Sequence, residues 1–194
     1  LLIGQHPDLF HENICAEMRG WQSEEGRSPF WTAVGQRFFD LDFSAADRLS
    51  ALEGNRFIQE LMPKHPIYLQ LLSQEARDSV GRPHDSSRAA MDLLLREGFR
   101  YEGYVDVFDA GPQVHARRSE IATIRNGRAL PVLAGEPASD APDALVARSG
   151  LADFAVAWGP AQLTEDGVRL STPLRRALDL APGDPVFVTP GEAA

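Results

Sequence analysis

Residues 57–84 read FIQELMPKHPIYLQLLSQEARDSVGRPH, and this stretch follows neither a helical nor a strand period. It sets three prolines, one lysine and two histidines among apolar side chains. Regular core elements seldom combine fixed proline φ angles with so many titratable groups. An irregular segment of this kind is more typical of a site than of a core, so we expect it to carry functional residues.

The segments around this stretch carry helix signals, because each begins with a residue that caps helices well. The expected helix starts are Ser28 followed by Pro29, Asn55, Ser73, and Asp85 or Ser86. The first helix is expected to extend to Phe38 through an aromatic apolar stripe, and the second to end at Leu61, before Pro63. The last is expected to run to Glu97 and to end at Gly98.

Two strands are expected in the first half of the chain. Residues 13–19 alternate, with Ile14, Ala16 and Met18 on one face and Cys15, Glu17 and Arg19 on the other. The polar face is either solvated or directed into a cleft, and in the second case Glu17 and Arg19 are candidates for substrate binding. Residues 99–108 form the second expected strand.

The pattern changes in the second half, where four short β-like runs lie close together. These runs are 144–148, 154–158, 168–171 and 186–189. Residues 113–128 are charged and expected to be partly helical, and 134–143 are expected to form a loop rich in Ala, Pro, Asp and Gly. We therefore expect a first domain over 1–125 and a small β-barrel-like domain over 126–194.

Composition excludes several classes of function. The 194 residues are 43% hydrophobic and 24% charged, which is ordinary for a globular protein. A net charge of −9 argues against binding to nucleic acid or to an anionic membrane surface. The single cysteine, Cys15, cannot form an internal disulfide, which favours a reducing cytoplasm.

Five ordered segments resemble the arginine N-succinyltransferase family, in its alpha-chain type. They are AEMRG (16–20), GRSPFW (26–31), FFDLDFSAAD (38–47), FIQELMPKHPIY (57–68) and EGFRYEGYVDVFDAGP (97–112). The resemblance extends over about the first 125 residues and is weaker beyond them. It implies an α+β fold with a GNAT-like mixed sheet flanked by helices, followed by a small β-rich region.

The same resemblance implies an acyltransferase that moves the succinyl group of succinyl-CoA to the α-amino group of L-arginine. Succinyl-CoA is then a co-substrate, no further cofactor is expected, and the protein is expected to be a cytoplasmic homo- or hetero-oligomer. The family's CoA pyrophosphate loop precedes the AEMRG strand, so this N-terminal part is expected to be missing from the sequence. The proton-donor histidine of the family falls in a Gly-x-x-His turn, which here is residues 81–84 and ends at His84.

Physical chemistry is compatible with that role. A thiolate leaving group needs a proton, and thiols titrate near about 8.5 while histidine titrates near about 6.5, so an imidazolium can supply it at neutral pH. The alternative is that His84 is a polar turn residue without a role. Lys64 and His65, in the rigid Pro-Lys-His-Pro corner, are candidates for binding the substrate, although a structural or solvated role is also open to them.

Other chemistries are disfavoured. The spacing of His65 and His84 fits no compact metal-ligand motif, so no metal site is predicted. Cys15 has no neighbouring histidine or basic turn that would make it a nucleophile. Among the carboxylates, Glu17, Glu60, Asp106 and Asp109 are each candidates for binding the guanidinium group of arginine.

Two alternatives to the arginine enzyme stay open. In the first, the chain is a non-catalytic fragment or subunit that binds arginine or a partner chain. In the second, it is a GNAT-type acyltransferase for a related amine such as ornithine.

Overall fold

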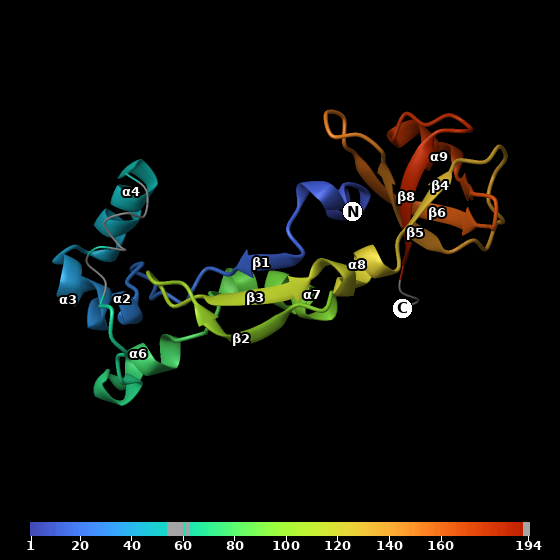
Figure 1. The fold of residues 1–194 in the computed structure, drawn as a ribbon. Helices are drawn as coiled ribbons and strands as arrows, with labels where there is room; N and C mark the ends of the chain where they lie inside the picture. Colours follow the sequence, from blue (N-terminus) through green and yellow to red (C-terminus); the bar gives the residue numbers. More distant parts are fainter. Residues whose placement is uncertain (54–59, 61–62, 192–194) are drawn as a thin grey trace. The chain divides into compact units, whose positions relative to one another are not determined.

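The helices and strands of this chain fall into two compact units (Figure 1), which a computed structural model describes over residues 1–53, 60 and 63–191. One unit is Cys15–Ala116, and the other combines Leu1–Ile14 with Arg117–Ala194. Apart from Glu60, the helix predicted at 55–61 lies outside the described residues. Among the described helices, none is both long and apolar enough to cross a membrane.

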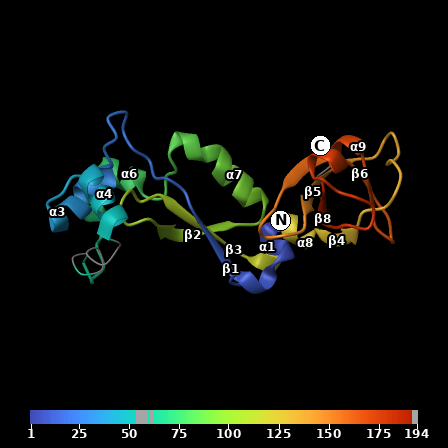
Figure 2. The ribbon, with the colours of Figure 1, turned by 90° about the horizontal axis from the view of Figure 1, so that it is seen from above.

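The Cys15–Ala116 unit is built on a three-stranded sheet in the order β1–β3–β2. Its elements are β1 (Asn13–Glu17), α2 (Pro29–Ala33), α3 (Gly35–Phe39), α4 (Phe43–Glu53), η2 (Leu69–Leu71), α6 (Gln74–Ser79), η3 (Asp85–Ser87), α7 (Arg88–Arg96), β2 (Arg100–Val105) and β3 (Pro112–Arg117). Helix α7 runs along one face of this sheet (Figures 1 and 2). In β1, Ile14 and Ala16 are more buried than their neighbours, as the predicted alternation requires.

Trp31 is the centre of the apolar core of this unit. Its ring stacks on those of Phe39 and Phe108, with centroids 5.3 and 5.4 Å away, and its indole N–H donates to the Leu41 carbonyl at 2.9 Å. The N-terminus of α2 is fixed by the Ser28 hydroxyl, which accepts the Trp31 backbone N–H at 3.1 Å. The predicted cap at Ser28 is therefore confirmed, and it places the tryptophan in the core.

The single helix predicted from Ser28 to Phe38 is wrong, because α2 ends at Ala33 and α3 starts at Gly35. The reason is close packing at Gly35. A methyl group on that residue would lie 2.2 Å from the Trp31 ring, so only glycine lets the chain pass over the indole. The apolar spacing predicted a helix but carried no information about this contact.

Strand β3 was also missed, since its region was expected to be partly helical. Val114 and Ala116 are buried while Gln113 and His115 are half-buried, which is the alternation of a strand. The strand pairs antiparallel with β2, where Arg100 lies opposite His115 and Tyr101 opposite Val114. Pairing with residues far away in the sequence decides this element, and the charged neighbours obscured it.

The second unit contains a curled five-stranded sheet in the order β4–β8–β5–β6–β7. Its elements are α1 (Leu2–Gln5), η1 (Pro7–Leu9), η4 (Arg118–Glu120), α8 (Ala122–Arg125), β4 (Arg128–Pro131), β5 (Asp143–Arg148), β6 (Val156–Leu163), β7 (Val168–Leu170), α9 (Thr172–Ala177) and β8 (Pro185–Pro190). A parallel bridge from Val132 to Val168 joins the two ends of this sheet. The predicted barrel-like β region is thus confirmed, with β4 as the strand that sequence analysis did not predict.

The interior of this sheet holds an aliphatic core. Val146, Val168, Leu170 and Val188 are each fully buried, and Leu174 of α9 closes the core. The N-terminal residues belong to the same unit, because the Arg118 guanidinium donates to the carbonyls of Pro7 and Phe10. The sequence predicted one boundary near residue 125, whereas the compact units meet after Ile14 and after Ala116. Residues 126–194 lie wholly within one unit.

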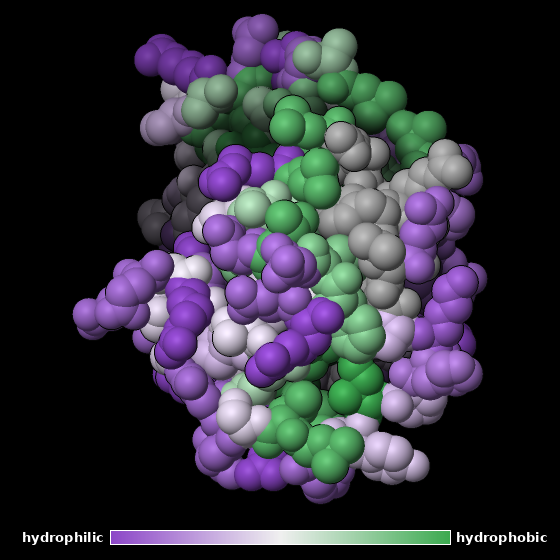
Figure 3. All heavy atoms as spheres, turned by 90° about the vertical axis from the view of Figure 1, so that its left-hand side faces the viewer, coloured by the Kyte–Doolittle hydropathy of each residue, from purple (hydrophilic) through white to green (hydrophobic). Residues whose placement is uncertain are grey.

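Several large apolar side chains remain on the surface of the Cys15–Ala116 unit. Hydrophobic side chains show on the side that carries α3 and α4 (Figure 3). In the same unit Tyr68, Leu71 and Leu52 are 72%, 81% and 84% exposed. Helix α7 contains no buried residue, and its Leu93 is 55% exposed. Exposed apolar side chains that gather in one patch are typical of surfaces that contact another polypeptide.

Candidate functional site

His84 caps the short helix η3, which leads directly into α7. Its ring nitrogen Nδ1 accepts the Ser86 backbone N–H at 3.2 Å and lies 2.7 Å from the Ser86 hydroxyl oxygen. The predicted cap at Asp85 or Ser86 for the helix that runs to Glu97 is wrong. His84 caps η3, and Ser87 is the N-cap of α7, without a side-chain hydrogen bond. Because Nδ1 is used in this way, Nε2 is the ring nitrogen left for chemistry.

The 81–84 turn is attached to the chain that follows β1. The His84 N–H donates to the Arg19 carbonyl at 2.8 Å, and the Trp21 N–H donates to the Arg82 carbonyl at 3.0 Å. On its other side, the Gly81 N–H donates to the Ala110 carbonyl at 2.9 Å. Three backbone hydrogen bonds to two distant segments therefore fix the turn in place.

A buried carboxylate joins these two distant segments to each other. Asp109 is 8% exposed, and its two carboxylate oxygens accept the backbone N–H groups of Gly20 at 2.8 Å and Gly111 at 2.9 Å. Burial raises the pKa of Asp109, while the two hydrogen bonds oppose that shift. The carboxylate thus acts within the fold, as a clamp between the end of β1 and the 106–111 loop.

Asp106 has a comparable local role. Its Oδ1 accepts the N–H groups of Phe108 at 2.7 Å and of Asp109 at 3.2 Å, which closes the turn before β3. Two of the carboxylates considered for the guanidinium group therefore bind backbone amides of this loop. Glu17 is different, because it is exposed and accepts a hydrogen bond from the Gln113 side chain at 2.6 Å.

The structure brings some of the predicted site residues together and leaves others apart. Arg19 meets His84 through its carbonyl, while its exposed guanidinium donates to the Gln22 side chain at 2.8 Å. Lys64 and His65 are both exposed at the bend before η2, and neither has a hydrogen bond or ion pair within the described residues. No described contact joins them to the His84 turn, so their binding role stays a prediction.

Sequence analysis missed a cation–π contact beside His84. The Arg82 guanidinium lies over the Trp21 ring, with its central carbon 4.6 Å from the ring centroid. The sequence signal for this contact was a single tryptophan at the start of a polar loop, since few surface loops contain so large an aromatic side chain without a packing partner. This side-chain contact adds to the backbone hydrogen bond between the same two residues.

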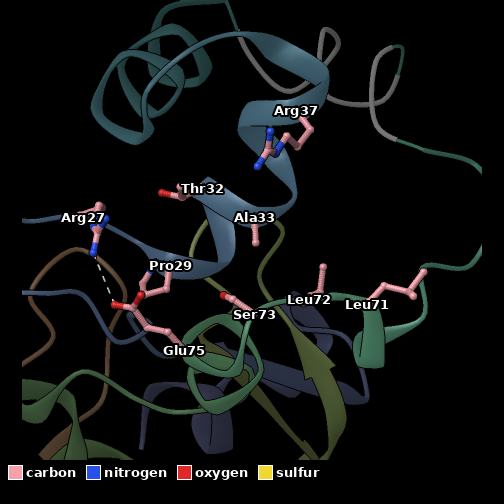
Figure 4. Close-up of a pocket in the computed structure, with 9 residues that line it drawn as sticks. All are labelled: Arg27, Pro29, Thr32, Ala33, Arg37, Leu71, Leu72, Ser73 and Glu75. Atoms are coloured by element: carbon pink, nitrogen blue, oxygen red, sulfur yellow. Dashed lines mark ion pairs between the residues drawn. The ribbon is translucent and has the colours of Figure 1, made fainter.

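A separate cavity of about 220 Å³ lies in the same unit, between α2 and the segment from η2 to α6 (Figure 4). Its lining residues are Arg27, Pro29, Thr32, Ala33, Arg37, Leu71, Leu72, Ser73 and Glu75. Arg27 and Glu75 form an ion pair across it at 3.5 Å. No residue of the 81–84 turn lines this cavity, which distinguishes it from the candidate catalytic position.

Two other kinds of chemistry can be compared with the described residues. Within this part of the chain, no group of three or more His, Cys, Asp or Glu side chains could hold a metal ion. Cys15 is exposed as a residue. The pKa of its thiol is nevertheless raised, mainly by partial desolvation and to a smaller extent by the negative charge of Glu17. A raised pKa lowers the thiolate fraction, which is the opposite of what an activated nucleophile requires.

Comparison with protein families assigns the chain. Residues 1–123 match the model for the arginine N-succinyltransferase beta subunit, and residues 128–190 match the model for the C-terminal domain of that subunit. The chain belongs to the arginine N-succinyltransferase family. The resemblance to this family inferred from the sequence is thus confirmed, while the assignment to its alpha-chain type stays a prediction.

Individual members of the arginine N-succinyltransferase family match nearly the whole chain but only part of their own length. It is 39% identical to the beta subunit of the Pseudomonas aeruginosa enzyme, over 98% of this chain and 56% of that subunit. The alpha subunit from the same organism is also 39% identical, over 94% and 54%. An Escherichia coli arginine N-succinyltransferase is 42% identical, over 92% and 52%. The chain therefore spans about half the length of the curated relatives it matches.

A solved structure of the same family supports the fold. The arginine/ornithine succinyltransferase subunit AI from Pseudomonas aeruginosa superimposes with a TM-score of 0.82 at 34% identity, over 97% of this chain and 54% of that one. This likeness confirms the predicted α+β fold, a GNAT-like part followed by a C-terminal β region.

Proposed function

We propose that the protein containing this chain transfers the succinyl group of succinyl-CoA to the α-amino group of L-arginine, giving N2-succinylarginine and CoA. Membership of the arginine N-succinyltransferase family supports this proposal. The observation that carries it is the geometry of His84, whose Nδ1 is occupied by Ser86 while Nε2 has no hydrogen bond in the described part of the chain.

In this mechanism the uncharged α-amino nitrogen attacks the thioester carbonyl carbon, forming the new C–N bond. The tetrahedral intermediate then collapses, the C–S bond breaks, and the electron pair leaves on the sulfur of CoA. In the imidazolium form both ring nitrogens of His84 carry protons, so Nδ1–H donates to the Ser86 hydroxyl oxygen, 2.7 Å away, in place of accepting the Ser86 backbone N–H. Nε2 then donates its proton to the thiolate, while the attacking nitrogen loses a proton to solvent. General acid catalysis of this kind contributes about 10²–10⁴ in rate.

We also propose the setting of the reaction. Succinyl-CoA acts as a co-substrate with no further cofactor, and the protein works in the cytoplasm as an oligomer. Two relatives named as alpha and beta subunits support the oligomer, and so do the exposed apolar side chains of η2 and α7. Size-exclusion chromatography with light scattering on the full gene product tests this, and a monomer at all concentrations would contradict it.

The central test follows CoA thiol release and the mass of the product in the full-length gene product, with succinyl-CoA and arginine. We expect His84→Ala to lower turnover by about 10²–10⁴-fold without loss of fold. His11→Ala is the matched control, since this histidine is exposed and lies in the other unit. Absence of succinylarginine with the unchanged protein would overturn the function, and normal turnover of His84→Ala would remove His84 from the mechanism.

One observation favours a second amine substrate. The solved relative is named an arginine/ornithine succinyltransferase, so ornithine is a candidate alongside arginine. Competition between the two amines in one reaction, with both products separated by mass, measures the ratio of kcat/KM directly.

The non-catalytic alternative is tested by titrating succinyl-CoA into the 194-residue chain, because clear binding would contradict it.

A further inference from the structure

Tyr101 lies against the turn that carries His84. A methyl group on Gly81 would lie 2.3 Å from the Tyr101 hydroxyl oxygen and 3.0 Å from the ring carbon that bears it. The phenol thus fills the space that a side chain at position 81 would take. Gly81 has a φ of +72°, a conformation that glycine adopts without strain but that also leaves the backbone free to move.

Other restraints on this turn differ in kind from the tyrosine contact. The hydrogen bonds to Arg19, Trp21 and Ala110 are made by backbone groups, which fix the ends of the turn but not the space beside its glycine. Tyr101 supplies bulk at that position. Its side chain is 40% exposed, and within the described residues its hydroxyl has no hydrogen-bond partner, so the contact with Gly81 is one of packing.

We propose that Tyr101 is a positioning residue for His84, acting by packing its phenol against Gly81. The proposal rests on the proposed function of His84. A turn that loses this support can shift the His84 ring relative to the thioester, and a displacement of about 1 Å at a reacting group can cost on the order of 10²-fold in rate.

The same strand offers a matched control. Tyr104 is 60% exposed, and its ring meets His115 edge-on with centroids 5.3 Å apart. An irregularity in the β2–β3 pairing lies between Tyr101 and Val105, with Gly103 at a φ of +87°. Each tyrosine therefore adjoins a different part of the unit, Tyr101 the turn of His84 and Tyr104 the ring of His115.

The first experiment needs no enzymatic activity. Carbon–proton NMR correlations of the histidine rings are recorded for the full gene product, with the signals of His84 and His115 assigned by substitution. Tyr101→Ala is expected to shift the His84 signals and leave those of His115 unchanged, whereas Tyr104→Ala is expected to do the reverse. Unchanged His84 signals in folded Tyr101→Ala protein would overturn the proposal.

The second experiment separates positioning from general stability. In Tyr101→Ala we expect kcat to fall about tenfold or more while KM for arginine stays within about twofold. Tyr101→Phe keeps the ring and is expected to retain most of kcat, and Tyr104→Ala is expected to retain all of it. Normal kcat in folded Tyr101→Ala protein would contradict the proposal.

A pair of substitutions tests the contact itself, including the case in which Tyr101→Ala fails to fold. Gly81→Ala alone places a methyl group 2.3 Å from the tyrosine hydroxyl oxygen and also strains the backbone at its φ of +72°. Tyr101→Phe removes the oxygen and so relieves the first of these two costs. We expect the double variant to fold and turn over better than Gly81→Ala alone, and the absence of any rescue would overturn the proposal. If the unchanged protein forms no succinylarginine, the proposed function fails, while the NMR shifts still decide whether Tyr101 positions His84.

Discussion

Two proline-containing corners of the 57–84 stretch look alike in sequence and differ in structure. Each combines proline with histidine, Pro63 to Pro66 around His65 and Pro83 beside His84. The 81–84 turn forms hydrogen bonds to residues 19, 21 and 110, and its histidine is half-buried. The corner at 63–66 is largely exposed, and His65 has no hydrogen bond within the described residues.

This difference shows that a rigid, irregular sequence does not by itself make a catalytic position. Prolines restrict φ at both ends of the stretch. What distinguishes the 81–84 turn is that backbone groups remote in sequence hold it from two sides. A general acid has to stay within hydrogen-bond reach of the atom it protonates, so an anchored turn suits that role better than an exposed corner does.

Gly20 lies in the segment to which the 81–84 turn is anchored, and we expect its substitution to have the largest effect on stability. Gly20→Ala would place a methyl group 2.4 Å from the Asp109 carbonyl oxygen and 2.6 Å from its carboxylate. We expect a loss of about 3 kcal/mol in the free energy of unfolding, because the backbone has to shift and the amide–carboxylate bond is weakened. Urea unfolding of the full gene product measures this loss.

Gly26→Ala provides the control for that substitution. Gly26 has a φ of +76° but nothing within 4 Å of an added methyl group. Only the backbone preference of glycine is lost there, so we expect a cost of about 1 kcal/mol. Equal effects of the two substitutions would show that Asp109 does not clamp the end of β1.

These contacts also explain what sequence could and could not predict. The Ser28 and Ser73 caps, the strand from residue 13 and most of the C-terminal strands follow from local signals, and the structure confirms them. The strand β3 depends on pairing with distant residues, and the interruption before Gly35 depends on packing against Trp31. The position of His84 in the chain was accessible through family resemblance, but its anchoring to Arg19 was not.

The anchoring carboxyl of Asp109 should make the stability of the protein depend on pH. Burial raises its folded-state pKa above the usual 3.8, with Asp106 adding to the shift and Arg19 opposing it. A raised carboxyl pKa favours the folded state below the unfolded pKa, and this contribution is lost as the pH rises through the folded pKa. Wild-type stability should therefore contain a component that declines from about pH 4 upward, which Asp109→Asn lacks.

Measured stability of Asp109→Asn should also be lower by about 1 kcal/mol at pH values above the folded-state pKa, because the amide offers one acceptor oxygen where the ionised carboxylate offers two. Asp140→Asn, at an exposed carboxyl in the other unit, is the control for the general effect of removing one charge. Parallel stability curves for wild type and Asp109→Asn between pH 4 and pH 7 would contradict the assigned direction of the shift.

The exposed corner is tested by a weaker effect. If Lys64 and His65 bind the substrate, the double variant Lys64→Ala with His65→Ala should raise KM for arginine about threefold to tenfold and leave kcat within about twofold. Its free energy of unfolding should stay within about 0.5 kcal/mol of wild type, because both side chains are exposed. An unchanged KM would leave the corner without a role in arginine binding.

Ser86 tests how far the anchoring of His84 depends on a side chain, and we expect the smallest effect here. Its hydroxyl oxygen is 2.7 Å from His84 Nδ1, but its backbone N–H reaches the same nitrogen at 3.2 Å. Ser86→Ala removes the oxygen that accepts from Nδ1 in the imidazolium form but keeps the backbone hydrogen bonds of the turn, so turnover should fall by less than about tenfold, since a net hydrogen bond is worth about 1 kcal/mol. A fall as large as that of His84→Ala would show that the hydroxyl, rather than the backbone of the turn, holds the imidazole in its productive orientation.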